Sequence, residues 1–261
     1  MSANETPARA PRKRATIIIG AIVGVVVAVL LASFIYAKVI NKADKALDQS
    51  TVDSLLAGTT TVADAPTTTG APAASSTTAA PTTAAAAGAD GTWTASADSI
   101  LGYRVEESIN GFDTVANGRT NAVTGSLTIG GSVATAAEFT VDMTTFKSDE
   151  GKRDGQFNGR IMSVDQFPTA TFVLTQPIDF GAVPADGGTV TASATGDLTL
   201  RGVTKSVTFE LSATYKNGRI AVLGNIPVVF ADYGIPNPSI ATIVTEDNGL
   251  LEFAIVFDKA A

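Results

Sequence analysis

The clearest pattern along the chain is an alternation of apolar and polar positions with a period of two residues. The segment VTFELSATY (207–215) places every second side chain on one apolar face. The alternation recurs in AEFTVDM (137–143), TATFVLT (169–175), GDLTL (196–200) and LLEFAIVFD (250–258). A period of two with one apolar face is typical of antiparallel strands that cover a single interior. The pattern therefore predicts an all-β domain.

Turn residues separate these segments and suggest how the strands connect. Four pairs are predicted turns: Asn117-Gly118, Gly130-Gly131, Asn217-Gly218 and Asn248-Gly249, of which Asn217-Gly218 lies between two long alternating segments. Pro227 interrupts an alternating segment, which predicts an edge or a bulge there. About eight strands can form a sandwich or a barrel, and closure into a barrel removes exposed edges. An antiparallel barrel of about eight strands has room for side chains alone or for one small ligand, as in lipocalins.

The inward faces of the strands supply the candidate cavity. They are Phe139, Val141, Met143, Phe172, Leu174, Leu198, Leu200, Phe209, Leu211, Phe253 and Ile255. Alternating apolar residues usually form a core that fills itself. The same residues would line the cavity if the barrel is hollow.

The segment GKRDGQFNGRIMSVDQFPTATF (151–172) breaks the alternation between two strands. Ser148 followed by acidic residues predicts the start of a short helix. Phe157, Ile161 and Met162 share a spacing that places them on one apolar face. A short helix between two barrel strands lies across an open end, so we expect it to act as a lid.

The N-terminal part of the chain has a different pattern. Thr16–Ala37 is a run of 22 residues without a charge. A helix of that length reaches about 33 Å, which matches the ~30 Å hydrocarbon core of a bilayer. The sequence predicts a transmembrane helix at 16–37. A cleaved signal peptide is the alternative, although Ile35-Tyr36-Ala37 does not fit an A-x-A cleavage site.

Basic residues predict the orientation of this helix. Four Lys and Arg residues precede the run and three follow it closely. Positive-inside reasoning favours residues 1–15 as a cytoplasmic basic tail and an extracytoplasmic C-terminal domain, in a single-pass protein of the cell membrane. Small residues recur every four positions and make a homodimer possible: Gly20, Gly24, Ala28 and Ala32.

Residues 38–91 connect the predicted span to the β domain. The first part is charged, and the part from Gly58 onward consists almost entirely of Thr, Ala, Pro, Gly and Ser. Such a composition cannot bury a core, so a juxtamembrane segment followed by a disordered linker is predicted. We expect this tether to lift the domain of residues 92–261 off the membrane.

Composition excludes several kinds of chemistry. The chain has 261 residues, no Cys and no His, and its net charge is −7. Without Cys it has no disulfide and no thiol nucleophile. Without His it has no imidazole that could act as a general base or as a metal ligand. We expect no cofactor and no bound metal. An acidic protein also does not suit nucleic acid, which binds basic surfaces.

Two spaced motifs carry a resemblance to a known family. Arg153-Asp154 is followed by a short helix and by FPTATF (167–172), and then by GDLTLRGVTK (196–205). These residues resemble the YceI-like family of polyisoprenoid-binding proteins over about 160 residues. The resemblance implies a lipocalin-like barrel with an elongated apolar cavity for an isoprenoid or another long-chain lipid. Many members carry His before Gly-Val-Thr, where this chain has Arg201, which speaks against a role for imidazole.

Basic residues of the lid segment are candidates for contact with a lipid head group. Arg153, with Lys152 and Arg160, has the donors that bind phosphate. The structural alternative is an ion pair that fixes the lid to the barrel rim.

Three functions follow as hypotheses. The first is a membrane-tethered, extracytoplasmic protein that holds a polyisoprenoid or similar lipid, without catalysis. The second is a structural or adhesive surface domain with a self-filled core. The third is a cell-wall hydrolase that uses loop carboxylates, for which Asp149, Glu150, Asp154 and Asp232 are the candidates.

Overall fold

The computed structural model describes residues 12–36, 38, 43–57 and 88–260, and the side chains of the first helix from residue 22 onward. Its helical elements are α1 (Arg12–Ile35), α2 (Gln49–Ala57), η2 (Met143–Thr145), α3 (Gly151–Gln156), the π-helical turn η3 (Phe157–Ile161) and η4 (Phe230–Tyr233). Its strands are β1 (Gly91–Ala95), β2 (Ile100–Ile109), β3 (Phe112–Thr120), β4 (Val123–Gly130), β5 (Val133–Asp142), β6 (Thr169–Leu174), β7 (Ile178–Asp179), β8 (Gly188–Leu200), β9 (Val203–Lys216), β10 (Arg219–Val229), β11 (Ile243–Thr245) and β12 (Asn248–Lys259).

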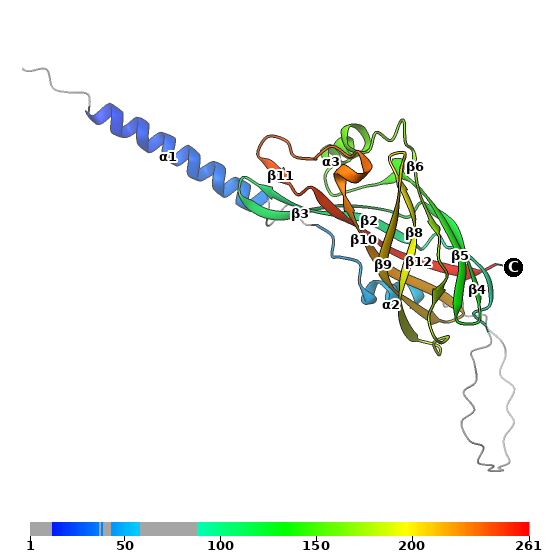
Figure 1. Cartoon of the computed structure of the whole chain (residues 1–261). Helices are drawn as coiled ribbons and strands as arrows, with labels where there is room; N and C mark the ends of the chain where they lie inside the picture. Colours follow the sequence, from blue (N-terminus) through cyan, green and yellow to red (C-terminus); the bar gives the residue numbers. More distant parts are fainter. Residues whose placement is uncertain (1–11, 37, 39–42, 58–87, 261) are drawn as a thin grey trace, which may run out of the picture.

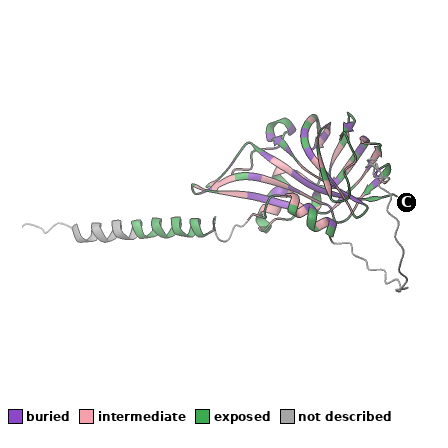
Figure 2. Ribbon diagram, turned by 90° about the horizontal axis from the view of Figure 1, so that it is seen from below, coloured by how far each residue is buried: buried purple, intermediate pink, exposed green. Residues whose placement is uncertain are grey.

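Eight of these strands close into an antiparallel barrel. The order around it is β1-β4-β5-β6-β8-β9-β10-β12, and the pairing of β12 with β1 completes the ring. The β2–β3 hairpin and β11 extend from β12 beyond the ring (Figure 1). The predicted all-β, eight-stranded barrel is confirmed. Burial alternates along the strands, and the inward residues form one continuous core (Figure 2).

Two of the four predicted turns have a different role. Asn217 and Gly218 both have positive φ and form the tight β9–β10 turn, and Gly130-Gly131 joins β4 to β5. Asn117-Gly118 instead lies inside β3, and Asn248-Gly249 begins β12. Gly118 is required within its strand because a Cβ there would lie 2.6 Å from the ring of Tyr103.

Pro227 marks a seam in the barrel wall. The pairing of β9 with β10 runs from Arg219 only to Gly224, whereas β10 pairs with β12 as far as Val229. Pro227 therefore lies where β10 has a hydrogen-bonded neighbour on one side only, and its missing N–H leaves no ladder position empty. The predicted edge at Pro227 is confirmed.

A segment before the barrel packs on its outer wall. Val52 and Leu56 of α2 are fully buried against Ala221 of β10 and Val256 of β12. The C-terminal strand is consequently apolar on both faces, not on one as its alternation predicted. Residues 43–57, predicted as part of a juxtamembrane segment, are attached to the barrel, because α2 buries its apolar face on the outer wall.

Helix α1 leaves the barrel at the end that carries the β2–β3 hairpin and β11 (Figure 1). Its described side chains are largely exposed and apolar. Within the part of the chain that the structure describes, no helix is long and apolar enough to cross a membrane. The span at 16–37 and the helix dimer stay predictions, and residues 1–11 and 58–87 lie outside the described residues.

Candidate lipid-binding cavity

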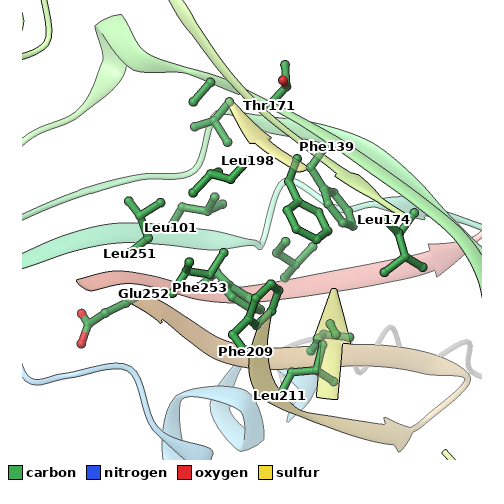
Figure 3. Close-up of a pocket in the computed structure, with 18 of the residues that line it drawn as sticks. Leu101, Phe139, Thr171, Leu174, Leu198, Phe209, Leu211, Leu251, Glu252 and Phe253 are labelled. Carbon is green, nitrogen blue, oxygen red and sulfur yellow. The ribbon is translucent and has the colours of Figure 1, made fainter. Parts of the chain in front are cut away.

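The barrel encloses a small inner chamber of about 130 Å³. All eleven inward residues named from the alternation line it: Phe139, Val141, Met143, Phe172, Leu174, Leu198, Leu200, Phe209, Leu211, Phe253 and Ile255. Figure 3 shows the labelled side chains of Phe139, Leu198 and Phe253 converging from different strands, whereas the carboxylate of Glu252 points away from them. Their contact with a lipid stays a prediction.

A chain of aromatic rings fills much of the barrel interior. Phe172 meets Phe209 edge to face with ring centroids 5.6 Å apart, and Phe209 meets Phe253 in the same way at 5.7 Å. Gly196 makes room for the first ring, because a Cβ there would lie 2.3 Å from Cζ of Phe172. The interior is therefore partly a self-filled core, and the inner chamber is what the rings leave open.

A larger outer chamber of about 570 Å³ lies at the mouth of the barrel, beneath the lid segment. Residues of β2, the end of β10, the lid and the loop before β11 line it, including Val105, Ile109, Val228 and Ile243. Met143, Phe146, Leu200 and Leu251 line both chambers. The two chambers are thus neighbours with a shared apolar wall that runs from the barrel interior to its mouth.

The lid consists of α3 and η3. Glu150, not Ser148, is the N-cap of α3, and its side chain accepts a hydrogen bond from the Lys152 amide at 3.2 Å. Ser148 instead donates its hydroxyl and its amide to the Asp154 carboxylate, at 2.7 and 2.8 Å. The lid is therefore closed onto the preceding loop by a local hydrogen-bonded ring.

Apolar contacts seat the lid on the mouth. Phe157 stacks on Tyr103 of β2 with centroids 4.8 Å apart and also meets Phe146 at 5.2 Å. Phe157, Ile161 and Met162 all line the outer chamber, as a lid requires. Burial raises the pKa of the Tyr103 hydroxyl well above its ordinary value. The lid thus rests on the aromatic side chains of Tyr103 and Phe146 through Phe157.

The predicted head-group residues take different positions. Arg153 lines the mouth and pairs with Glu107 at 3.5 Å and with Asp149. Burial alone would lower the pKa of Arg153, but Asp149 and Glu107 outweigh it and raise the pKa above its ordinary value. Lys152 also lines the mouth, whereas Arg160 donates to the carbonyl oxygens of Asn237 and Pro238 at 3.1 and 2.7 Å. Arg160 thus ties the lid to the loop before β11.

Sequence reasoning missed the polar member of this mouth. Glu107 lies on β2, on the same face as Tyr103, Val105 and Ile109, and its side chain is buried beside Arg153. A carboxylate on an otherwise apolar strand face was a visible signal in residues 100–109. Only the fold brings that face against the lid.

The loop carboxylates have structural partners. Asp149 pairs with Arg153, Glu150 caps α3, and Asp154 accepts from Ser148. Among the residues with described placement, no group of three or more acidic side chains could hold a metal ion. Arg201 donates to Ser163 at 3.2 Å and to Gly234, so it links the lid turn to the loop after η4.

Three solved structures show what this chain is similar to, and the first of them shares its fold. No curated protein matches the chain significantly in sequence. The structure of a polyisoprenoid binding domain from Saccharophagus degradans implicated in plant cell wall breakdown is similar, with 16% identity and a TM-score of 0.53 over 65% of this chain and 98% of that one. BcnA from Burkholderia cenocepacia has 19% identity and a TM-score of 0.49 over 61% and 96% of the two chains. The YceI protein of Campylobacter jejuni has 13% identity and a TM-score of 0.41 over 53% and 83%.

The family assignment rests on sequence. The YceI-like domain matches residues 93–257, which is more than half of the chain and spans β1 to β12. The protein belongs to the YceI-like family.

Proposed function

We propose that this protein holds a polyisoprenoid or a similar amphipathic lipid in its barrel, outside the cytoplasm, at the membrane to which residues 16–37 anchor it. The observation that carries the proposal is the shared apolar wall of the two chambers. It offers a path for a long tail from the mouth beneath Phe157 to the rings around Phe209. The protein then acts by binding, and no bond is broken.

The dimensions support a lipid tail. A volume of about 570 Å³ lies within the ~300–1,000 Å³ range of small-molecule sites. Burial of ~400 Å² of apolar tail is worth about 10 kcal/mol at ~25 cal/mol per Å² before the cost of association. The branched, flexible tail of an isoprenoid can adapt to two chambers that share an apolar wall.

The mouth supports an amphipathic ligand whose polar end stays near the lid. Arg153 pairs there with Glu107 and with Asp149, and Lys152 and Glu150 line the same mouth. The polar end of the lipid would lie at this group, where both donors and acceptors are present, while the tail lies among apolar side chains.

Photo-crosslinking of the full-length protein in detergent micelles tests this proposal. The probe is a long-chain isoprenol with a diazirine at the tail end, competed by unlabelled isoprenol. We expect crosslinked peptides from residues 139–146 and 198–211, and loss of the signal on competition. Crosslinks confined to α1, with no competition, would refute it.

Replacement of Leu200 provides a matched test. This side chain lines both chambers, so Leu200→Trp should block the path and lower the crosslinked fraction several-fold. The control is Val173→Trp, an exposed position on the outer face of β6. Equal crosslinking of the two variants would contradict a path through the shared wall.

A further inference from the structure

Residues 43–57, called the strap here, run down the outer wall of the barrel. Near the mouth, the Asp44 carbonyl accepts a hydrogen bond from Arg104 at 2.7 Å, and the Asp44 amide donates to Asn117 at 3.1 Å. Farther along, Val52 and Leu56 bury their side chains on β10 and β12. The strap is therefore attached at both of its ends, by polar contacts and by apolar ones.

The end of α1 is also attached to the barrel. Asn110 donates to the Ser33 hydroxyl at 2.7 Å, and Phe34 meets Phe112 edge to face at 5.5 Å. Asn110 and Phe112 belong to the tip of the β2–β3 hairpin. Tyr36, just beyond α1, lines the outer chamber. The helix thus ends directly at the mouth of the cavity.

The rim of the mouth carries exposed apolar side chains. Val244 of β11 is 62% exposed and Ile240 is 49% exposed, while Ile240 and Ile243 also line the outer chamber. β11 pairs with β2, whose hairpin tip contacts α1. Exposed apolar side chains are therefore present both on α1 and on the rim. α1 and β11 lie at the same end of the barrel (Figure 1).

Such a surface fits a lipid bilayer, since exposed apolar patches mark sites of interaction and apolar side chains insert at the acyl boundary. We propose that the strap and the α1 contact hold the mouth of the barrel against the membrane, with Ile240 and Val244 in contact with lipid. A lipid tail then enters the cavity from the bilayer without crossing water. The inference relies on the proposed function for the anchor at 16–37 and for the ligand, whereas the contact of the rim with lipid needs no ligand.

The same arrangement changes the role of residues 58–87. Their two ends are Ala57 of α2, at the outer wall, and Gly88, whose carbonyl accepts a hydrogen bond from Lys259 at 2.9 Å. Both ends are therefore held on the barrel. The Thr- and Pro-rich linker cannot set the distance between the membrane and the domain, because the strap fixes that distance before the linker begins.

Site-specific labelling of the full-length protein in liposomes tests the inference. The chain has no native cysteine, so single cysteines can be labelled cleanly with an environment-sensitive fluorophore. We expect lipid-borne doxyl groups to quench a label at Val244→Cys several-fold more than one at Val173→Cys, which is 48% exposed on β6. Aqueous iodide should show the reverse order. Equal access of iodide to both labels would overturn the inference.

A variant of the strap tests whether the attachment of α2 to the barrel is needed for the contact between the rim and the membrane. Leu56→Asp should release α2 and lower the lipid quenching at position 244 several-fold, although the contacts of Asp44 and of α1 remain. Ser54→Asp, on the exposed face of α2, should leave the quenching unchanged. Quenching that is undiminished in Leu56→Asp would overturn the role of α2 in holding the mouth at the membrane.

Two further outcomes distinguish this inference from the proposed function. Disulfide crosslinking of Val244→Cys to a second copy, with weak lipid quenching, would identify the rim as a subunit interface and overturn lipid contact. Lipid quenching at position 244 without isoprenoid crosslinking would support the membrane contact and refute the proposed ligand.

Discussion

The ion pair beneath the strap yields a quantitative prediction. Arg104 donates its Nε to Glu252 at 2.8 Å, and the two side chains are only 14% and 6% exposed. Removal of one partner leaves a buried charge uncompensated, which typically costs about 3–5 kcal/mol. Glu252→Leu should therefore lose that amount of the free energy of unfolding, out of a typical total of about 5–15 kcal/mol. The midpoint of thermal unfolding should fall by about 10 °C.

A double-mutant cycle isolates the pair. Replacement of a buried ion pair by apolar residues is often neutral, so Arg104→Met with Glu252→Leu should be more stable than the sum of the single losses predicts. The expected coupling is about 2 kcal/mol. The full-length protein can be unfolded by urea and followed by the fluorescence of Trp93, its single tryptophan, which is buried in the core. Additive losses would refute the reasoning, since they would mean that neither charge depends on the other.

Three other predictions follow from the same contacts. Gly196→Ala should displace the Phe172 ring, because the added Cβ would overlap it. We expect the free energy of unfolding in urea titrations to fall by about 1–3 kcal/mol and isoprenoid crosslinking to decrease. Wild-type stability and crosslinking would contradict the close contact between Gly196 and Phe172. Burial raises the pKa of Tyr103, so the folded state keeps this proton to higher pH than the unfolded chain, in which Tyr titrates near pH ~10. The contribution of Tyr103 to the free energy of unfolding is complete below that pH and is lost as the pH rises above it. Tyr103→Phe should therefore flatten the alkaline decline in stability, and an unchanged decline would count against this reasoning. Leu56→Ala should expose the strap to limited proteolysis at least several-fold faster than wild type, because a fully buried leucine is removed, and equal rates would argue that α2 is not docked.

Period-two alternation predicted antiparallel strands around one interior and part of the lining of the inner chamber. It left a sandwich and a barrel both open, and the removal of exposed edges and the family resemblance favoured the barrel. Every inward residue that the alternation identified, from Phe139 to Ile255, lies on that chamber. The alternation worked because one face of each strand meets a single interior. It could not predict how much of the interior the aromatic rings fill, because ring packing depends on which strands are neighbours.

The outer chamber and the strap depended on contacts between distant segments. Glu107 was visible as an acidic residue on an apolar face, but its partner Arg153 lies in the lid. Ala254 and Val256 made the last strand apolar on both faces, which signals a covering element on the outer wall. The covering element, α2, is too short to be distinguished by its own periodicity. Its apolar side chains, Val52 and Leu56, become buried only when they pack on the barrel.

The seam at Pro227 has a mechanical consequence for the mouth. Beyond Gly224, β10 is bonded to β12 and β9 is bonded to β8, and no ladder joins β9 to β10. This part of the wall can therefore bend outward without breaking backbone hydrogen bonds, each worth about 0.5–1.5 kcal/mol. Ile226 lines the inner chamber and Val228 the outer one, both on the unpaired stretch. We therefore expect a bulky tail to widen the passage most easily here, where fewer backbone hydrogen bonds hold the wall than in the rest of the barrel.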